Sequence, residues 1–197
     1  MNIELITGLA IFSFASSITP GPNNLMLMAS GANYGFRRSI PHMLGVAVGF
    51  VFMLMMVGIG LVQVFNAIPA SYTALKVVSV LYLLYLAAKI AMATPVARKD
   101  SSVGKPMNFW QAAAFQWVNP KGWTMALTSI AVYAPSQSLL AVGLVALIFG
   151  LINLPCISLW AVLGEKLRQF LADPARLKQF NWLMATLLVG SLYPVLR

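Results

Sequence analysis

The stretch Thr19-Pro20-Gly21-Pro22-Asn23-Asn24 lies in the middle of a mostly apolar run that covers residues 3–34. A membrane-spanning helix takes about 20 apolar residues, so the run predicts one spanning helix that is broken near its centre. Inside a bilayer, backbone groups freed by a break must be satisfied by protein, water or a ligand. The stretch therefore predicts a membrane protein with a polar site at the level of the break.

The composition of the whole chain supports this fold class. Of its 197 residues, 60% are hydrophobic and 9% are charged, whereas soluble domains carry about 25% charged residues. So few charges cannot coat a surface for water, and lipid must cover the chain instead. We predict an all-α, polytopic membrane protein with a single transmembrane domain over residues 1–197. Its six predicted spans cover residues 3–34, 41–66, 72–93, 109–134, 138–163 and 180–196.

The basic residues alternate along the chain with the predicted spans. The net charge is +9, from 13 Lys+Arg against 4 Asp+Glu. The connections between spans 2 and 3 and between spans 4 and 5 contain no Lys or Arg. The positive-inside rule then places the three basic connections in the cytoplasm and both termini outside. The charge thus reflects orientation rather than nucleic-acid binding, which would need a basic stripe on a soluble surface. The basic connections carry Arg37 and Arg38; Arg98, Lys99 and Lys105; and Lys166, Arg168, Arg176 and Lys178.

The two halves of the chain, approximately residues 1–97 and 104–197, have the pattern of an inverted repeat. Each half has three predicted spans, and its first span is broken by a proline, Pro20 in one half and Pro120 in the other. Three spans per half mean that the second half enters the membrane from the opposite side. Interrupted helices in corresponding positions indicate a transport site near the midplane. The alternative is two unrelated proline kinks, which membrane helices tolerate.

The two breaks have the chemistry of a site for a zwitterion. Pro20 removes the helical donor for the Ser16 carbonyl, and Pro120 does the same for Gln116. The half-helix that follows each break presents free N–H groups and a positive dipole end, which favour a carboxylate. An ammonium group suits the freed carbonyls. The residues predicted to bind a substrate are Thr19, Pro20, Gly21, Pro22, Asn23, Asn24, Gln116, Asn119, Pro120, Lys121 and Asn153.

Two further residues are candidates for proton coupling. Lys121 is predicted deep in a span, about 18 Å from Phe109 at ~1.5 Å per residue, and ionisable groups at such depth are functional candidates. Snorkelling or a structural contact to helix carbonyls is the alternative for Lys121. His42 is the sole histidine and is a candidate proton relay, with an interfacial position and no role as its alternative. Asn153 and Pro155, which polarise and interrupt the fifth span, line the same cavity or only pack helices.

Catalytic and metal-binding signals are missing from the sequence. Cys156 is the one cysteine, and no span contains a carboxylate pair or a Ser/His/Asp set, so we expect neither an enzyme nor a cofactor. The Gly31/Gly35 and Gly45/Gly49 pairs have the spacing that lets membrane helices pack closely. A homodimer built on one of these pairs is a partner that the sequence leaves open.

The run at residues 19–24, with Gly31, Gly35-Phe36-Arg37 and the glycines at 45 and 49, resembles the signature of the LysE/RhtB (lysine exporter / homoserine-threonine resistance) amino-acid exporter family. Asn119-Pro120-Lys121 resembles the second motif of that family, and the resemblance covers essentially the whole chain. It is strongest to the cysteine/O-acetylserine exporter branch. It implies a protein of the bacterial inner membrane that exports small amino acids or derivatives, homoserine-, threonine- or cysteine-like, without ATP and by proton exchange.

Two other functions compete with export. A membrane-embedded interaction or sensory subunit would not transport, yet a purely structural bundle has no need of two broken helices. A membrane enzyme is disfavoured because the spans lack a catalytic set. The resemblance and the residues together predict an amino-acid substrate and the lipid bilayer as partners.

Overall fold

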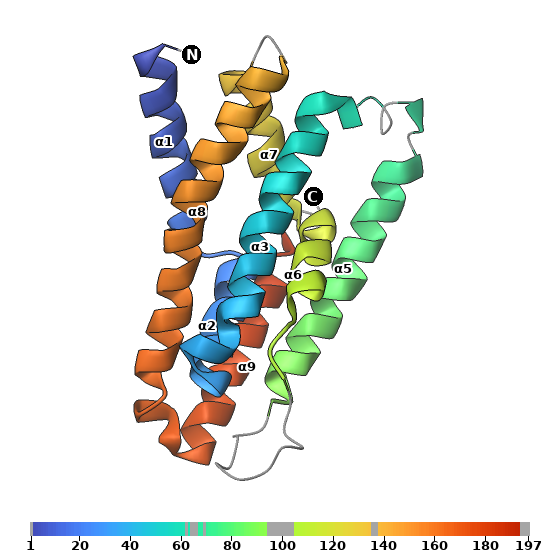
Figure 1. Cartoon of the computed structure of the whole chain (residues 1–197). Coiled ribbons are helices and arrows are strands. Elements are labelled where there is room, and N and C mark those ends of the chain that lie inside the picture. The colour runs from blue at the N-terminus through green and yellow to red at the C-terminus, as the bar shows by residue number, and fades with distance from the viewer. Residues whose placement is uncertain are drawn as a thin grey trace.

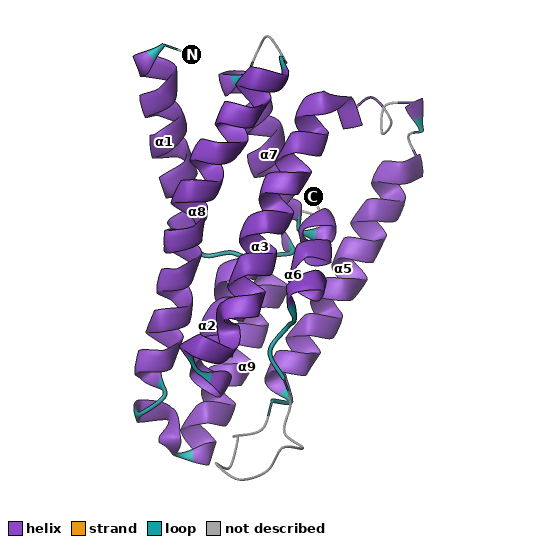
Figure 2. Ribbon diagram, viewed as in Figure 1, coloured by secondary structure: helices purple, strands orange, loops and turns teal. Residues whose placement is uncertain are grey.

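The computed structural model describes residues 2–61, 63, 67–68, 70–93, 105–134 and 138–193, and this part of the chain folds into helices joined by short connections (Figure 2). The helices run side by side as an elongated bundle (Figure 1). In chain order they are α1 (Ile3–Ile18), α2 (Pro22–Tyr34), α3 (Phe36–Met56), η1 (Val57–Leu61), α5 (Ala70–Ala91), α6 (Phe109–Phe115), η2 (Gln116–Val118), α7 (Pro120–Tyr133), α8 (Leu139–Leu167), η3 (Phe170–Ala172) and α9 (Pro174–Gly190).

Polar side chains cap the helices where sequence chemistry favours it. Asn2 accepts a hydrogen bond from the Leu5 N–H at the start of α1, and Asn108 forms a reciprocal capping box with Gln111 at the start of α6. Ser138 caps α8, and Asp173 caps α9. The N–H groups of Arg176 and Ala175 hold the pKa of the Asp173 carboxyl below its usual value, because hydrogen bonds to a carboxylate stabilise its charged form.

Three of the described helices are long and apolar enough to cross a membrane, spanning Phe36–Leu61, Thr73–Ala91 and Leu139–Leu167. The pair α1 and α2 forms a fourth candidate, bent by 52° at the break. The fold is therefore a multi-span helical membrane protein, as the composition predicts. The break between α1 and α2 lies roughly half-way between the two ends of the bundle (Figure 1).

The predicted helix boundaries need three corrections. The second helix begins at Phe36 rather than residue 41, so Arg37 and Arg38 lie in its first turn and not in a connection. The last begins at Pro174 rather than residue 180. Pro155 does not interrupt its helix, because α8 continues through it to Leu167. The predicted boundaries follow the apolar segments, but charged residues can form further helical turns beyond such a segment.

Most of the basic residues that the structure describes gather at one end of the bundle, with Lys76 near the start of α5 and Lys121 at the central break as exceptions. Figure 1 shows the start of α3, the end of α5, the end of α8 and the start of α9 together at that end, while α1 begins at the opposite end. Arg37 and Arg38, Lys166 and Arg168, and Arg176 and Lys178 belong to these helix ends. Arg98 and Lys99 lie outside the described residues. We call this end of the molecule the basic end.

Glycines allow α2, α3 and their neighbours to approach closely. A Cβ atom at Gly31 of α2 would collide with the Ala161 carbonyl of α8, and one at Gly164 of α8 would collide with the Met28 carbonyl of α2. Gly45 and Gly49 of α3 pack in the same way against α6. Gly31, Gly45, Gly49 and Gly164 therefore provide close helix contacts inside the chain.

Candidate functional site

The carbonyls from Ser16 to Thr19, at the end of α1, are all met by side-chain donors, including the two whose helical donors Pro20 and Pro22 remove. The Thr19 hydroxyl donates to the Ser16 carbonyl at 3.0 Å. Asn24 donates to the Ser17 and Thr19 carbonyls, each at 2.8 Å. Trp160 of α8 donates its indole N–H to the Ile18 carbonyl at 3.2 Å. A backbone break inside a bilayer needs such partners, because the surrounding lipid offers none.

Lys121 reaches across from the second break to the first. Its ammonium donates to the carbonyl of Thr19 at 2.8 Å and to the hydroxyl of Thr19 at 2.9 Å, and it lies 3.4 Å from the Pro20 carbonyl. Gly21 makes room for this side chain, because a Cβ there would lie 2.7 Å from the Lys121 Cδ. The two proline breaks, 100 residues apart in the chain, thus meet through one ammonium group.

The second break differs in detail from the prediction. The chain tightens into the 3₁₀ turn η2 and becomes extended at Asn119, with φ −91° and ψ 107°, before Pro120 opens α7. The Gln116 carbonyl is not left free, since it accepts a hydrogen bond from the Asn119 N–H at 3.3 Å. A 3₁₀ turn is a common way to satisfy carbonyls at a helix end.

A small cavity lies between the two breaks. It holds about 20 Å³, room for about one water molecule at ~10–15 Å³ each, which is less than an amino acid occupies. Gly21 and Asn119, the residues that precede α2 and α7, supply no side-chain cap to these helices. The buried Ser17 hydroxyl and the Asn119 side-chain carbonyl have no partner among the described residues. The lining residues are Ser16, Ser17, Gly21, Asn23, Asn24, Phe50, Asn119, Lys121, Gly122, Met125, Asn153 and Ile157.

The arrangement suits a small zwitterion. Free N–H groups at the starts of α2 and α7 attract a carboxylate, and the unpartnered oxygens of Ser17 and Asn119 accept from an ammonium group. Lys121 adds the one positive charge among the described residues that line the cavity. None of the lining residues is acidic, and no group of His, Cys, Asp and Glu in the described part of the chain has the arrangement of a metal site.

Residues 14–191 of this chain match the model of the LysE type translocator family. The chain belongs to that family. The cysteine/O-acetylserine efflux proteins of Escherichia coli (strain K12) and Shigella sonnei (strain Ss046) are each 30% identical to this translocator over 196 residues, covering 96% of both chains. That of Escherichia coli O139:H28 (strain E24377A / ETEC) is 29% identical over the same length. No solved structure matches the chain.

The translocator brings most of the predicted site residues together. Gly21, Asn23, Asn24, Asn119, Lys121 and Asn153 line the central cavity. Thr19 and Pro20 bind Lys121, and Pro22 and Pro120 open the two half-helices. Gln116 is fully buried beside the cavity. His42 does not join them: it is buried at a separate cavity towards the basic end.

Several lining residues of the translocator were not predicted. Ser16 and Ser17 are polar residues one turn before the first break, and Met125 lies four residues after Lys121 on the same helix face, so local signals for them exist. Phe50 and Ile157 have no such signal, because only the packing of α3 and α8 brings them to the cavity.

A reciprocal amide pair ties the two broken helices of the translocator together. Asn23 donates to the Gln116 side-chain oxygen at 2.9 Å, and Gln116 donates back at 3.2 Å. Hydrogen bonds between membrane helices contribute about 0.6 kcal/mol on average and up to about 1.7 kcal/mol. We expect Asn23→Ala and Gln116→Ala each to lower the melting temperature in detergent, and the double variant to lose less than their sum.

Asn23 and Asn181, which are not hydrogen-bonded to each other, provide the control for this double-mutant cycle. Asn181 pairs with Asn33 instead, at 2.8 Å, so Asn23→Ala and Asn181→Ala should be additive, as independent sites are. Additive losses for Asn23→Ala and Gln116→Ala would show that the amide pair contributes nothing of its own.

Proposed function

We propose that this translocator is a secondary exporter of small amino acids or their derivatives, cysteine and O-acetylserine among them, from the bacterial cytoplasm. The observation that carries the proposal is the meeting of two half-helix starts and one ammonium group at a small central cavity. The names of the relatives support the substrate class. Each relative is named a cysteine/O-acetylserine efflux protein and matches this chain over nearly its whole length.

We further propose six spans arranged as two inverted halves that alternate access to the cavity. The three long helices, the bent pair α1–α2, the broken pair α6–α7 and α9 supply the six. The broken pairs run in opposite directions, as an inverted repeat requires. The basic end faces the cytoplasm under the positive-inside rule. Both termini then lie on the outside of the inner membrane.

Lys121 is the group that we assign to proton coupling. When it releases a proton to the cytoplasm, the Thr19 hydroxyl and the Pro20 carbonyl lose this donor and can accept from the ammonium of the substrate. The carboxylate of the substrate binds the N–H groups at the starts of α2 and α7. When the proton returns from outside, the lysine ammonium takes back the Thr19 hydroxyl and the Pro20 carbonyl and displaces the substrate. One substrate then leaves the cell as one proton enters.

Efflux measurements test the proposal. We expect a strain that lacks the gene to release cysteine and O-acetylserine more slowly, after loading with precursors or dipeptides, than the same strain carrying the gene. In proteoliposomes, an imposed pH gradient should accelerate the flux. Equal efflux from both strains over a broad amino-acid panel, with no flux in proteoliposomes, would refute export and favour a non-transporting membrane subunit.

A further inference from the structure

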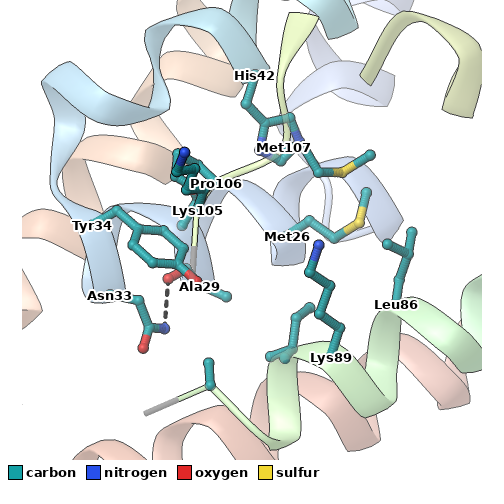
Figure 3. Close-up of a pocket in the computed structure, with 13 residues that line it drawn as sticks. Met26, Ala29, Asn33, Tyr34, His42, Leu86, Lys89, Lys105, Pro106 and Met107 are labelled. Atoms are coloured by element: carbon teal, nitrogen blue, oxygen red, sulfur yellow. Dashed lines mark hydrogen bonds between the residues drawn. The ribbon is translucent and has the colours of Figure 1, made fainter. Parts of the chain in front are cut away.

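A second cavity lies nearer the basic end than the central one. It holds about 60 Å³ and is lined by residues of α2, α3 and α5 and by the segment that leads into α6. Figure 3 shows the His42 ring and the Lys89 side chain entering it from different helices. On α2 the central cavity is lined by Asn23 and Asn24 and the second cavity by residues from Met26 to Tyr34, so the two cavities follow one another along that helix.

His42 is buried in this cavity without a partner. Its side chain is 1% exposed, and neither ring nitrogen has a hydrogen-bonding partner among the described residues. An imidazole always carries at least one N–H donor, and an unpaired buried donor is costly. The cavity therefore lacks an acceptor at this point, and a bound group with a lone pair would supply one.

The charges around the cavity select an anion. Lys89 lies in the last turn of α5, and Lys105 lies in the segment before α6. None of the described lining residues is acidic, so no carboxylate among them pairs with the two ammonium groups. Met26, Leu86 and Met107 form an apolar wall on one side of the cavity, next to the Lys89 side chain (Figure 3). The combination fits a carboxylate that carries a short, weakly polar side chain.

We propose that this second cavity is the loading site at which the carboxylate of the exported amino acid first binds from the cytoplasm. Lys89, Lys105 and the His42 N–H hold the carboxylate, and the methionine wall contacts its side chain. The substrate then passes along α2 to the central cavity. This inference rests on the proposed export function and assigns to it a specific point of entry.

Uptake of O-acetyl-L-serine into everted membrane vesicles tests the loading site, because the cytoplasmic face is then exposed to the medium. We expect Lys89→Gln combined with Lys105→Gln to raise KM about tenfold, the order of two solvent-screened ionic contacts, with the maximal rate retained. His42→Gln, which keeps a donor, should raise KM less than His42→Phe. Lys76→Gln is the matched control, because Lys76 is an exposed lysine of α5 outside the cavity.

Three outcomes are decisive. A KM for the double variant equal to that of Lys76→Gln, with wild-type transport intact, overturns the loading site and leaves export standing. Absence of transport by the wild-type protein overturns both. A comparison of vesicles of pure phosphatidylcholine with vesicles that also contain phosphatidylglycerol shows whether the cavity binds the carboxylate of the substrate or the phosphate of a lipid. A KM effect that vanishes in phosphatidylcholine would assign the cavity to lipid and overturn the proposal, whereas an effect of equal size in both supports it.

Discussion

Lys121→Ala is expected to lower efflux of O-acetylserine by about 10- to 100-fold while the protein still inserts and folds. The ammonium donates to the Thr19 carbonyl and hydroxyl, and hydrogen bonds to charged groups contribute about 1.5–3 kcal/mol, which corresponds to that range of rates. Folding survives because Asn24 still donates to the Thr19 carbonyl, and the Pro20 carbonyl loses only its long contact of 3.4 Å at an exposed position. The measurement is initial efflux rate per inserted protein.

Two further variants separate charge from shape at this position. Lys121→Met keeps much of the chain length but no charge, and we expect it to be as inactive as alanine. Lys121→Arg keeps the charge, but Gly21 already leaves little room beside the Lys121 chain, so we expect only partial recovery. Wild-type efflux by Lys121→Met would contradict both the coupling role and the binding role.

Gly164→Ala is expected to be the most destabilising single-methyl change in the described part of the chain. The added Cβ would meet the Met28 carbonyl and lie 2.9 Å from the Ala32 nitrogen, and both are backbone atoms of α2. Neither can rotate away, so α2 and α8 must separate along their contact. Overpacking typically costs about 1–3 kcal/mol, occasionally more. A fall in melting temperature in detergent, with loss of inserted protein, is the expected readout.

Gly143→Ala is the matched control on the same helix. A Cβ at Gly143 meets nothing within 4 Å, and alanine is the better helix former by about 1 kcal/mol. The two substitutions add the same methyl group to α8 and should shift the melting temperature in opposite directions. Equal shifts would mean that the close contact between α2 and α8 does not limit stability.

Local backbone chemistry made the breaks predictable. Pro20 and Pro120 remove donors wherever they occur, so the interruptions of both helices and the start of α7 at Pro120 follow from the residues alone. Pro155 shows the limit of that reasoning. The same loss of a donor leaves α8 continuous, because helix packing and not the proline alone decides whether a helix ends.

The sequence alone could not predict which residues the site residues contact. The depth of Lys121 was predictable from its distance to the helix start, but the Thr19 oxygens that it binds belong to the other break, 102 residues away in the chain. The amide pair of Asn23 and Gln116 is equally non-local. Hydropathy likewise marks Lys89 as a helix-end residue and gives no hint that it shares a cavity with His42.

The carbonyls around the first break acquire their hydrogen-bond donors at different times during synthesis of the chain. The Thr19 hydroxyl and the Asn24 amide satisfy the Ser16, Ser17 and Thr19 carbonyls, and both donors are synthesised within a few residues of their acceptors. The Ile18 and Pro20 carbonyls instead depend on Trp160 and Lys121. At about 5–20 residues per second, the ribosome reaches Lys121 roughly 5–20 s after Pro20. While the nascent chain inserts, α1 and α2 must therefore keep the Ile18 and Pro20 carbonyls hydrated or hydrogen-bonded to other groups. These carbonyls acquire Trp160 and Lys121 as donors only after the second half of the chain has been synthesised.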